Sequence, residues 1–151
     1  MLLEKALPLN YFSKKSIDGD TAEDFHKYCD NQGKTLIIIE TDEGRKFGGF
    51  TNDSWNTDDK WRKNKNDFVF SLDLNKKYCN NGGDSTVSCK SEGPVFGYRR
   101  WEEVDIYFGP NLNNGKSNTS NTQSFHTNYE LNNGKEDFKT KELKVYKVII
   151  N

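Results

Sequence analysis

The segment 35–51, TLIIIETDEGRKFGGFT, constrains the fold more than any other part of the chain. Four consecutive apolar residues, Leu36 to Ile39, leave no polar face, which predicts a strand from Thr35 to Thr41 that is buried on both sides. Asp42-Glu43-Gly44 has the composition of a tight turn, so Lys46 to Thr51 is expected to return antiparallel to the first strand. The segment therefore predicts a hairpin in the interior of a β-rich domain.

Two consecutive glycines, Gly48 and Gly49, lie in the middle of the returning strand. Paired glycines often cradle a phosphate, but a phosphate loop needs them between a strand and a helix, followed in the Walker type by a lysine and a hydroxyl residue. The segment has neither a Gly-Lys-Ser/Thr triplet nor a G-x-G-x-x-G spacing, and Phe50 and Thr51 continue without a helical pattern. Glycine inside a strand instead indicates a bulge or the close approach of another backbone.

Residues 20–29, DTAEDFHKYC, have the pattern of a short helix. Asp20 or Thr21 can cap the first amides, and Asp24, three residues after Thr21, completes a box-like arrangement. We expect His26 on the solvated side of this helix. The stripe that is expected to be buried consists of Phe25, Tyr28 and Cys29.

A second short helix is expected over residues 58–64, DDKWRKN, with Asn56 or Thr57 as its cap. Its acidic first turn suits the helix dipole, and Trp55 and Trp61 are expected to dock it on the sheet. The basic residues of this region are more typical of a solvated polar helix face than of an interaction site. They are Lys60, Arg62, Lys63 and Lys65.

Short strands make up most of the remaining pattern, and there is no internal repeat. Residues 67–74, DFVFSLDL, alternate with period two, and residues 109–124 are expected to form a long polar loop. Further strands are expected at residues 85–89, 95–98, 104–108, 125–131 and 138–150. The fold class is therefore α+β and mainly β, a two-sheet antiparallel β-sandwich flanked by two short helices.

Length, charge and composition narrow the functional classes. The 151 residues predict a single domain, 1–151, in which residues 1–12 form an N-terminal extension. The net charge of −1 argues against nucleic-acid binding, which needs a basic footprint. The first residues, MLLEKALPLNYF, have the features of neither a signal peptide nor a membrane span, so we expect a cytoplasmic protein without membrane insertion.

The cysteines and histidines do not form a recognisable catalytic pattern. Cys29 is the one cysteine that lies near a histidine in the sequence, and a cysteine hydrolase with His26 or His126 would need a signature that is missing. Cys79 and Cys89 flank NNGGDSTVS and are candidates to face each other across a hairpin, but a cytosolic protein keeps such thiols reduced. No zinc spacing is present. Sacrificial thiol chemistry stays open, because Cys89 precedes a lysine.

Two groups of carboxylates are candidates for a glycosidase or a divalent-cation site. One is Asp58-Asp59, and the other contains Glu102, Glu103 and Asp105. Neither has the spacing of a calcium-binding loop, and acids at strand ends and helix starts are commonly solvated. We therefore expect no metal, no cofactor and no catalytic residues.

The order of landmarks along the chain resembles the TLDc domain family, from about Ser13 to Val148. The residues that carry the resemblance are Asp24-Phe25-His26 with Cys29-Asp30, Thr35 to Ile38, Phe47 to Thr51 with Ser54-Trp55, Asp67 to Leu72, Gly93 to Gly97, Asp105 to Tyr107, Phe138-Lys139 and Glu142 to Tyr146. The resemblance implies a β-sandwich flanked by two helices. It also implies contact with the vacuolar proton-pumping ATPase, protection from oxidative stress, or both, and hence recruitment to endolysosomal membranes through a partner.

Two groups of residues are singled out as functional or structural candidates. Partner binding is assigned to Tyr98, Arg99, Arg100 and Trp101, whose types are enriched at interface hot spots, although packing of Trp101 into the core is an equal alternative. The structural motif comprises Phe47, Gly48, Gly49, Phe50, Trp55, Gly93, Pro94 and Gly97. The competing functions are a free-standing carbohydrate- or ligand-binding β-sandwich and a weak thiol-based antioxidant protein.

Overall fold

The computed structural model describes residues 9–97, 103–117 and 124–149, and the side chains from Ser13 onward. All its strand pairs are antiparallel and form one path in the order β4-β7-β8-β9-β10-β11-β2-β3-β5-β6, with β1 paired to β11. The elements are β1 (Leu9–Lys14), α2 (Lys15–Asp18), α3 (Ala22–Cys29), β2 (Thr35–Thr41), β3 (Lys46–Thr51), β4 (Trp61–Arg62), β5 (Phe68–Ser71), β6 (Lys76–Cys79), β7 (Thr86–Val87), β8 (Val95–Phe96), β9 (Ile106–Phe108), β10 (Asn114–Lys116) and β11 (Asp137–Val148).

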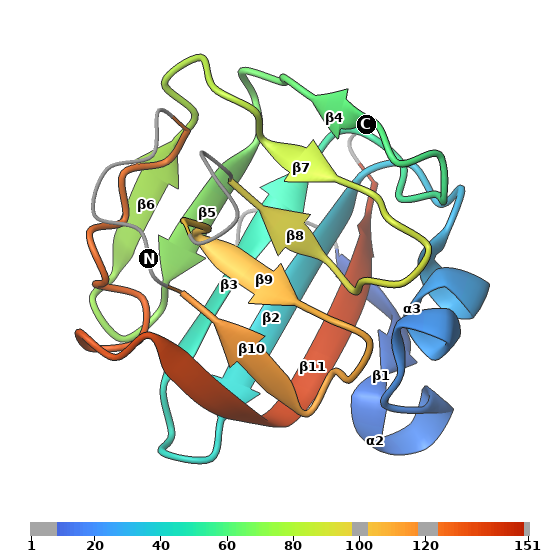
Figure 1. Ribbon diagram of the computed structural model, residues 1–151, viewed down its shortest axis with the longest axis horizontal. Coiled ribbons are helices and arrows are strands. Elements are labelled where there is room, and N and C mark those ends of the chain that lie inside the picture. The colour runs from blue at the N-terminus through green and yellow to red at the C-terminus, as the bar shows by residue number, and fades with distance from the viewer. Residues whose placement is uncertain (1–8, 98–102, 118–123, 150–151) are drawn as a thin grey trace.

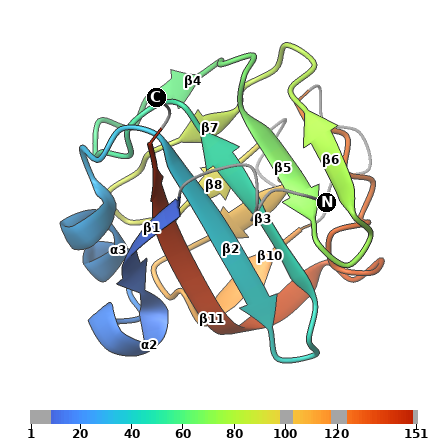
Figure 2. The ribbon, with the colours of Figure 1, turned by 180° about the vertical axis from the view of Figure 1, so that it is seen from behind.

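The strands lie in two layers that β11 connects. Figure 1 shows β7 to β10 in front of β3, β2 and β11, and Figure 2, from behind, shows the second group in front. In both views α2 and α3 lie beside β1 at one edge. The first three residues of β11 pair with β10, and its last five pair with β1, while β2 pairs along most of its other side. The predicted mainly β fold with two short helices is confirmed, but the strands form one continuous hydrogen-bonded path and not two separate sheets.

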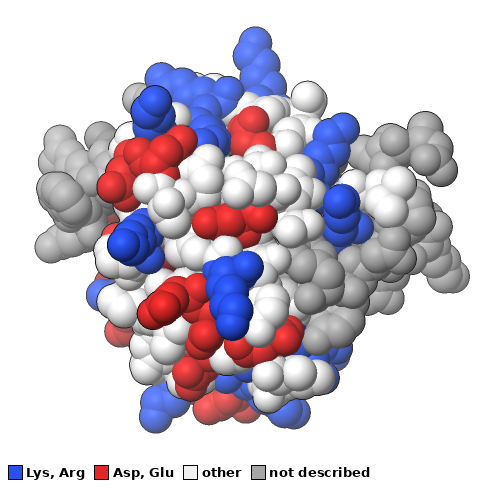
Figure 3. All heavy atoms as spheres, turned by 90° about the vertical axis from the view of Figure 1, so that its right-hand side faces the viewer, with Lys and Arg blue, Asp and Glu red and all other residues white. Residues whose placement is uncertain are grey.

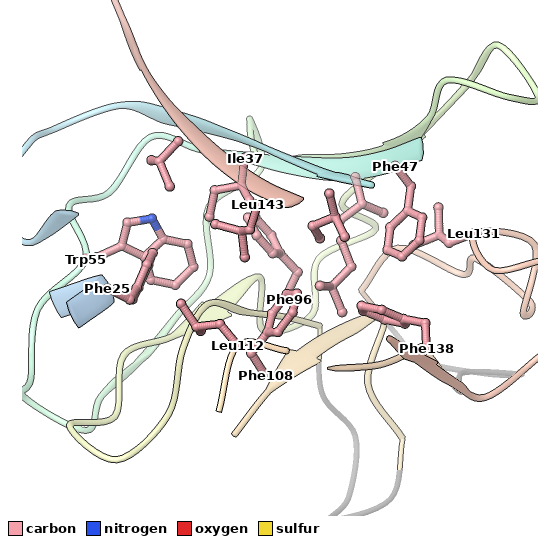
Figure 4. Packing of buried hydrophobic residues seen from close by; sticks show 14 of the residues in the cluster. Phe25, Ile37, Phe47, Trp55, Phe96, Phe108, Leu112, Leu131, Phe138 and Leu143 are labelled. Carbon is pink, nitrogen blue, oxygen red and sulfur yellow. The ribbon is translucent and has the colours of Figure 1, made fainter. Parts of the chain in front are cut away.

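The core lies between the two layers and is rich in aromatic side chains. Trp55, Phe47 and Phe96 are fully buried there, and Figure 4 shows them with residues from both layers. A second apolar cluster, which includes Phe50 and Phe70, lies apart from this core. Because successive residues of a strand point to opposite faces, a strand without a polar face, such as β2, contributes to both clusters.

Helix α3 begins as the sequence predicts. Thr21 Oγ1 accepts a hydrogen bond from the amide of Asp24 at 3.1 Å, and Asp24 Oδ2 accepts one from the amide of Thr21 at 3.2 Å, so the capping box is complete. Phe25 and Cys29 are buried, whereas Tyr28 is exposed. The hairpin of β2 and β3 also has the predicted bounds, with Gly44 at a φ of 88° in its turn.

The helix predicted over residues 58–64 is wrong, because this segment contains β4. Asn56 Oδ1 accepts the amide of Asp58 at 2.9 Å, and Asp58 Oδ1 accepts the amide of Lys60 at 3.0 Å. These short side-chain bonds to the backbone compete with helical bonds. The second helix is instead α2, and of the two tryptophans expected to dock a helix only Trp55 is buried.

Three further expectations about secondary structure are also wrong. Residues 125–131 do not form a strand: residues 128–131 form turns, and φ is positive at His126, Asn128 and Tyr129. The polar segment 109–124 contains β10, and it also contributes the buried side chain of Leu112 to the core. Part of the expected N-terminal extension forms β1, whose partner strand lies more than a hundred residues later.

Candidate functional site

The twin glycines lie where β3 contacts its neighbours most closely. Gly48 pairs with Ile38 of β2 and Phe70 of β5 in a regular register, so no bulge is present. A Cβ atom on Gly48 would overlap the carbonyl oxygen of Ile37, and one on Gly49 would lie 2.6 Å from the ring of Phe96. The glycines therefore serve close packing, and their place inside a strand does not have the strand-to-helix geometry of a phosphate loop.

The other residues of the structural motif lie in or beside the core. Trp55 donates from Nε1 to Thr35 Oγ1 at 3.0 Å and packs edge-to-face on Phe25 and Phe96. A Cβ on Gly93 would lie 2.6 Å from Leu112 Cδ2. The motif is completed by Phe47 in the main core, Phe50 in the second cluster, Pro94 directly before β8, and Gly97, at a φ of 73°, directly after it. All eight residues of the motif are therefore buried.

His26 is buried, with 8% of its surface exposed, contrary to its predicted place on the solvated side of the helix. Its Nδ1 lies 2.7 Å from Asp30 Oδ1, and its Nε2 lies 2.8 Å from the carbonyl oxygens of both Cys89 and Glu92. Carbonyl oxygens only accept hydrogen bonds, so Nε2 carries a hydrogen and donates it. His26 therefore links α3 to the turn at residues 89–92 and is not placed as a general base.

The three cysteines are free and lie in different environments. Burial raises the pKa of Cys29 to about 12. Burial, together with the nearby Glu92 and Asp59, raises the pKa of Cys89 to about 12 as well. Cys79 is exposed on β6, which pairs with β5, so it does not face Cys89 across a hairpin. Thiols with such pKa values are almost wholly protonated at neutral pH and are poor nucleophiles.

Asp67 is a buried carboxylate that the sequence analysis did not propose as a site residue. It holds the segment that follows β3 through hydrogen bonds. It accepts hydrogen bonds from the amide of Asn52 at 2.8 Å and from Thr51 Oγ1 at 3.1 Å, and burial raises its pKa. Nearby, Asn64 donates its amide to Ser85 Oγ at 3.1 Å. Period-two alternation placed Asp67 in an expected strand over residues 67–74, whereas β5 begins at Phe68, and only the fold shows that Asp67 is buried.

Two of the carboxylates considered for catalysis, Asp58 and Asp105, are engaged by neighbouring side chains. Asp58 pairs with Arg62 at 2.8 Å, and the hydrogen bond from Arg62 lowers the pKa of Asp58. Asp105 is buried and accepts a hydrogen bond from Thr127 Oγ1 at 2.7 Å, while Glu102 lies outside the described residues. In the part of the chain that the structure describes, no group of three His, Cys, Asp or Glu side chains is arranged to hold a metal ion.

The predicted partner-binding residues, Tyr98, Arg99, Arg100 and Trp101, lie outside the described residues. They belong to the connection between β8 and β9, which are neighbouring antiparallel strands. Among residues 9–97, 103–117 and 124–149, no helix has the length and hydropathy needed to span a bilayer.

The comparison with known proteins identifies one family. The family model of the TLDc domain matches residues 5–149, nearly the whole chain. No curated protein sequence matches the chain significantly.

Proposed function

The chain belongs to the TLDc domain family, and from this premise we propose that it is a non-catalytic protein-interaction module that binds the vacuolar proton-pumping ATPase. Protection from oxidative stress would be a consequence of that binding. The observation that carries the proposal is the family match, which runs over residues 5–149 and so includes every described element. The protein would work in the cytoplasm and reach endolysosomal membranes through its partner.

The environments of His26 and of the cysteines support a non-catalytic role. His26 forms a structural link, in which Nε2 faces the carbonyl oxygens of Cys89 and Glu92 and Nδ1 lies beside the Asp30 carboxylate. A module of this kind changes a partner's activity only if its affinity differs between two states of that partner, such as the assembled and disassembled pump. No catalytic group in the chain is needed for that effect.

The raised thiol pKa values favour protection through a partner over direct scavenging. Cys29 and Cys89 would each have a pKa of about 12, so neither supplies the thiolate that reacts with oxidants. A direct antioxidant role would then depend on Cys79 alone. Replacing Cys79 by serine is expected to leave stress protection in cells unchanged if the partner is responsible.

The proposal is tested with the full chain and purified proton pump. We expect the immobilised chain to capture subunits of the pump's peripheral sector, and we expect the chain in solution to change the rate of ATP hydrolysis or the extent of assembly. An unrelated β-rich domain of similar size and charge is the control. Equal capture by the control would contradict the proposal, and a melting-temperature increase with saccharides alone would favour the carbohydrate-binding alternative.

A further inference from the structure

The second apolar cluster lies on what we call the outer face, the side of β11, β2, β3 and β5 that points away from the main core. Its members are Leu36, Phe50, Phe68, Phe70 and Val148, with Ile38, Leu72 and Tyr146 partly buried against them. One row runs in register across four neighbouring strands and consists of Tyr146, Leu36, Phe50 and Phe68. The rings of Phe50 and Phe68 stack with their centroids 5.1 Å apart. The outer face is thus a continuous apolar surface.

The outer face is buried, although the described elements leave it open. Leu36 and Phe70 both have 0% of their surface exposed. Figure 2 has the outer face toward the viewer, with β7 to β10 behind it and α2 and α3 at its edge. In the described ranges 9–97, 103–117 and 124–149, no helix or strand lies over this face in that view. A sheet face in contact with water usually carries polar side chains, so the outer face has the composition and burial of a covered surface.

The neighbouring edge of the molecule has a different character. Figure 3 faces the side that carries α2 and α3, and it shows acidic and basic side chains distributed over that side. Glu23 and Lys27 are among the exposed residues of α3. Mixed charge of this kind is typical of a solvated surface, whereas a contiguous apolar surface indicates contact with another segment or molecule. The need for a cover is therefore specific to the outer face.

Residues 1–8, MLLEKALP, are the segment of the chain best suited to cover the outer face. They contain Met1, Leu2, Leu3, Ala6 and Leu7. They directly precede β1, whose first residue, Leu9, pairs with Val148 of the cluster. Of the other segments outside the described ranges, 118–123 (NTSNTQ) has no apolar residue, 98–102 joins β8 and β9 in the opposite layer, and 150–151 is a dipeptide.

The length of residues 1–8 matches the width of the outer face. An extended chain spans about 3.3 Å per residue, so this segment reaches up to about 26 Å. Neighbouring strands lie about 4.8 Å apart, and four such steps lead from β1 through β11, β2 and β3 to β5, a distance of about 19 Å. Leu2, Leu3 and Leu7 are therefore within reach of every strand that contributes to the cluster.

We propose that residues 1–8 form an intramolecular strap that lies across the outer face, with Leu2, Leu3 and Leu7 packed on the cluster. The strap closes the outer face to other proteins, and its displacement opens a second, apolar interaction surface. Because the strap is joined to β1 directly, its local concentration at the face is high, and it competes effectively with a separate molecule. This inference goes beyond the proposed function and holds whether or not the proton pump is the partner.

The position of the strap is tested by paramagnetic relaxation in the full chain, with a nitroxide on Lys5→Cys and with Cys79 and Cys89 replaced by serine. We expect the amide signals of β3 and β5 to lose several-fold more intensity than those of β8 and β9, because the second layer lies about 10 Å farther away. The matched control carries the nitroxide on Lys27→Cys, at an exposed position of α3, and should spare the amides of β5. Equal losses in the two layers with the Lys5→Cys label would overturn the proposal.

The covering role is tested by replacing Leu3 and Leu7 together with aspartate. We expect the fluorescence of the apolar dye ANS to increase several-fold, with an unchanged near-UV circular dichroism spectrum, because the core between the layers is not altered. The control replaces Glu4 and Lys5 with glutamine, which keeps the leucines, and should leave the fluorescence as in wild type.

Two further results would contradict the strap. One is a folded aspartate variant that binds no more dye than wild type. The other is a wild-type dimer in sedimentation whose dissociation on dilution exposes the outer face, which would assign the cover to a second copy of the chain. If the aspartate variant does not fold, the nitroxide measurement decides, because it keeps all three leucines.

Discussion

At the scale of single residues, the absence of a side chain decides how closely β3 packs on its neighbours. Gly48 faces the Ile37 carbonyl and Gly49 faces the Phe96 ring, at positions where any Cβ would require a shift of backbone or of a buried aromatic ring. Both neighbours are held by the sheet and the core, so neither can give way cheaply. The sequence indicated either a bulge or a close approach, and the regular register of β3 decides for the close approach.

Gly48→Val is expected to lower the free energy of unfolding by about 1–3 kcal/mol, because the new side chain overpacks a filled space. Urea denaturation measures the change. Gly109→Ala is the control: a Cβ there would lie 3.4 Å from Tyr107 Oη, an ordinary contact, so its effect should stay within about 0.5 kcal/mol. Equal stability of Gly48→Val and wild type would contradict the close approach.

Asp67 gives a pH dependence with a defined sign. Burial raises the pKa of Asp67 in the folded chain above its ordinary value of 3.8. At pH values between 3.8 and the raised pKa, the folded chain therefore binds more protons than the unfolded chain. The stability that wild type has relative to Asp67→Asn should therefore increase as the pH falls from 7 towards 4, and urea denaturation at several pH values measures this. Asp58, with its lowered pKa, provides the opposite case, because the stability it contributes is lost on acidification.

At the scale of elements, hydrogen bonds to loops that are far away in sequence hold α3 in place. Its N-terminus is tied by the amide of Ala22, which donates to the carbonyl of Pro110 at 2.8 Å, and its middle is tied by His26 to the turn at residues 89–92. The helix has only eight residues, a length at which isolated helices are unstable in water. These tertiary contacts therefore maintain α3 as a helix.

His26→Ala is expected to lower the free energy of unfolding by about 2–3 kcal/mol, because the Cys89 and Glu92 carbonyls and the Asp30 carboxylate lose their partner. Hydrogen exchange should increase first in α3. Lys27→Ala, at the exposed neighbouring position, should cost less than about 0.5 kcal/mol. If both variants unfolded at the same urea concentration, His26 would not be the link between α3 and the turn.

At the scale of the whole molecule, one long strand connects the two layers. β11 pairs with β10 near its start, with β1 near its end and with β2 along most of its length, so the first and last described strands are neighbours. The closure of the domain thus depends on contacts of the largest sequence separation.

Replacing Arg99, Arg100 and Trp101 together by alanine is expected to reduce capture of proton-pump subunits by about tenfold or more, because Arg and Trp are enriched at interface hot spots, without changing the melting temperature. Quantitative mass spectrometry of the captured subunits measures the effect. Lys139→Ala, on the exposed side of β11, is the control and should capture as wild type does. A lower melting temperature with unchanged capture would assign Trp101 to the core instead of to the partner surface.

Local patterns in the sequence by themselves determined the hairpin of β2 and β3, the cap of α3 and the membership of the family, because each depends on neighbouring residues or on a fixed order of landmarks. Only the tertiary structure decided that Leu9–Lys14 forms a strand on β11, that residues 58–64 turn into β4, and that His26 and Asp67 are buried. The bonds that replace the helix at residues 58–64 span only two residues, so they leave no helical or strand period in the sequence. The other cases depend on contacts between residues far apart in the chain, which a local pattern does not contain.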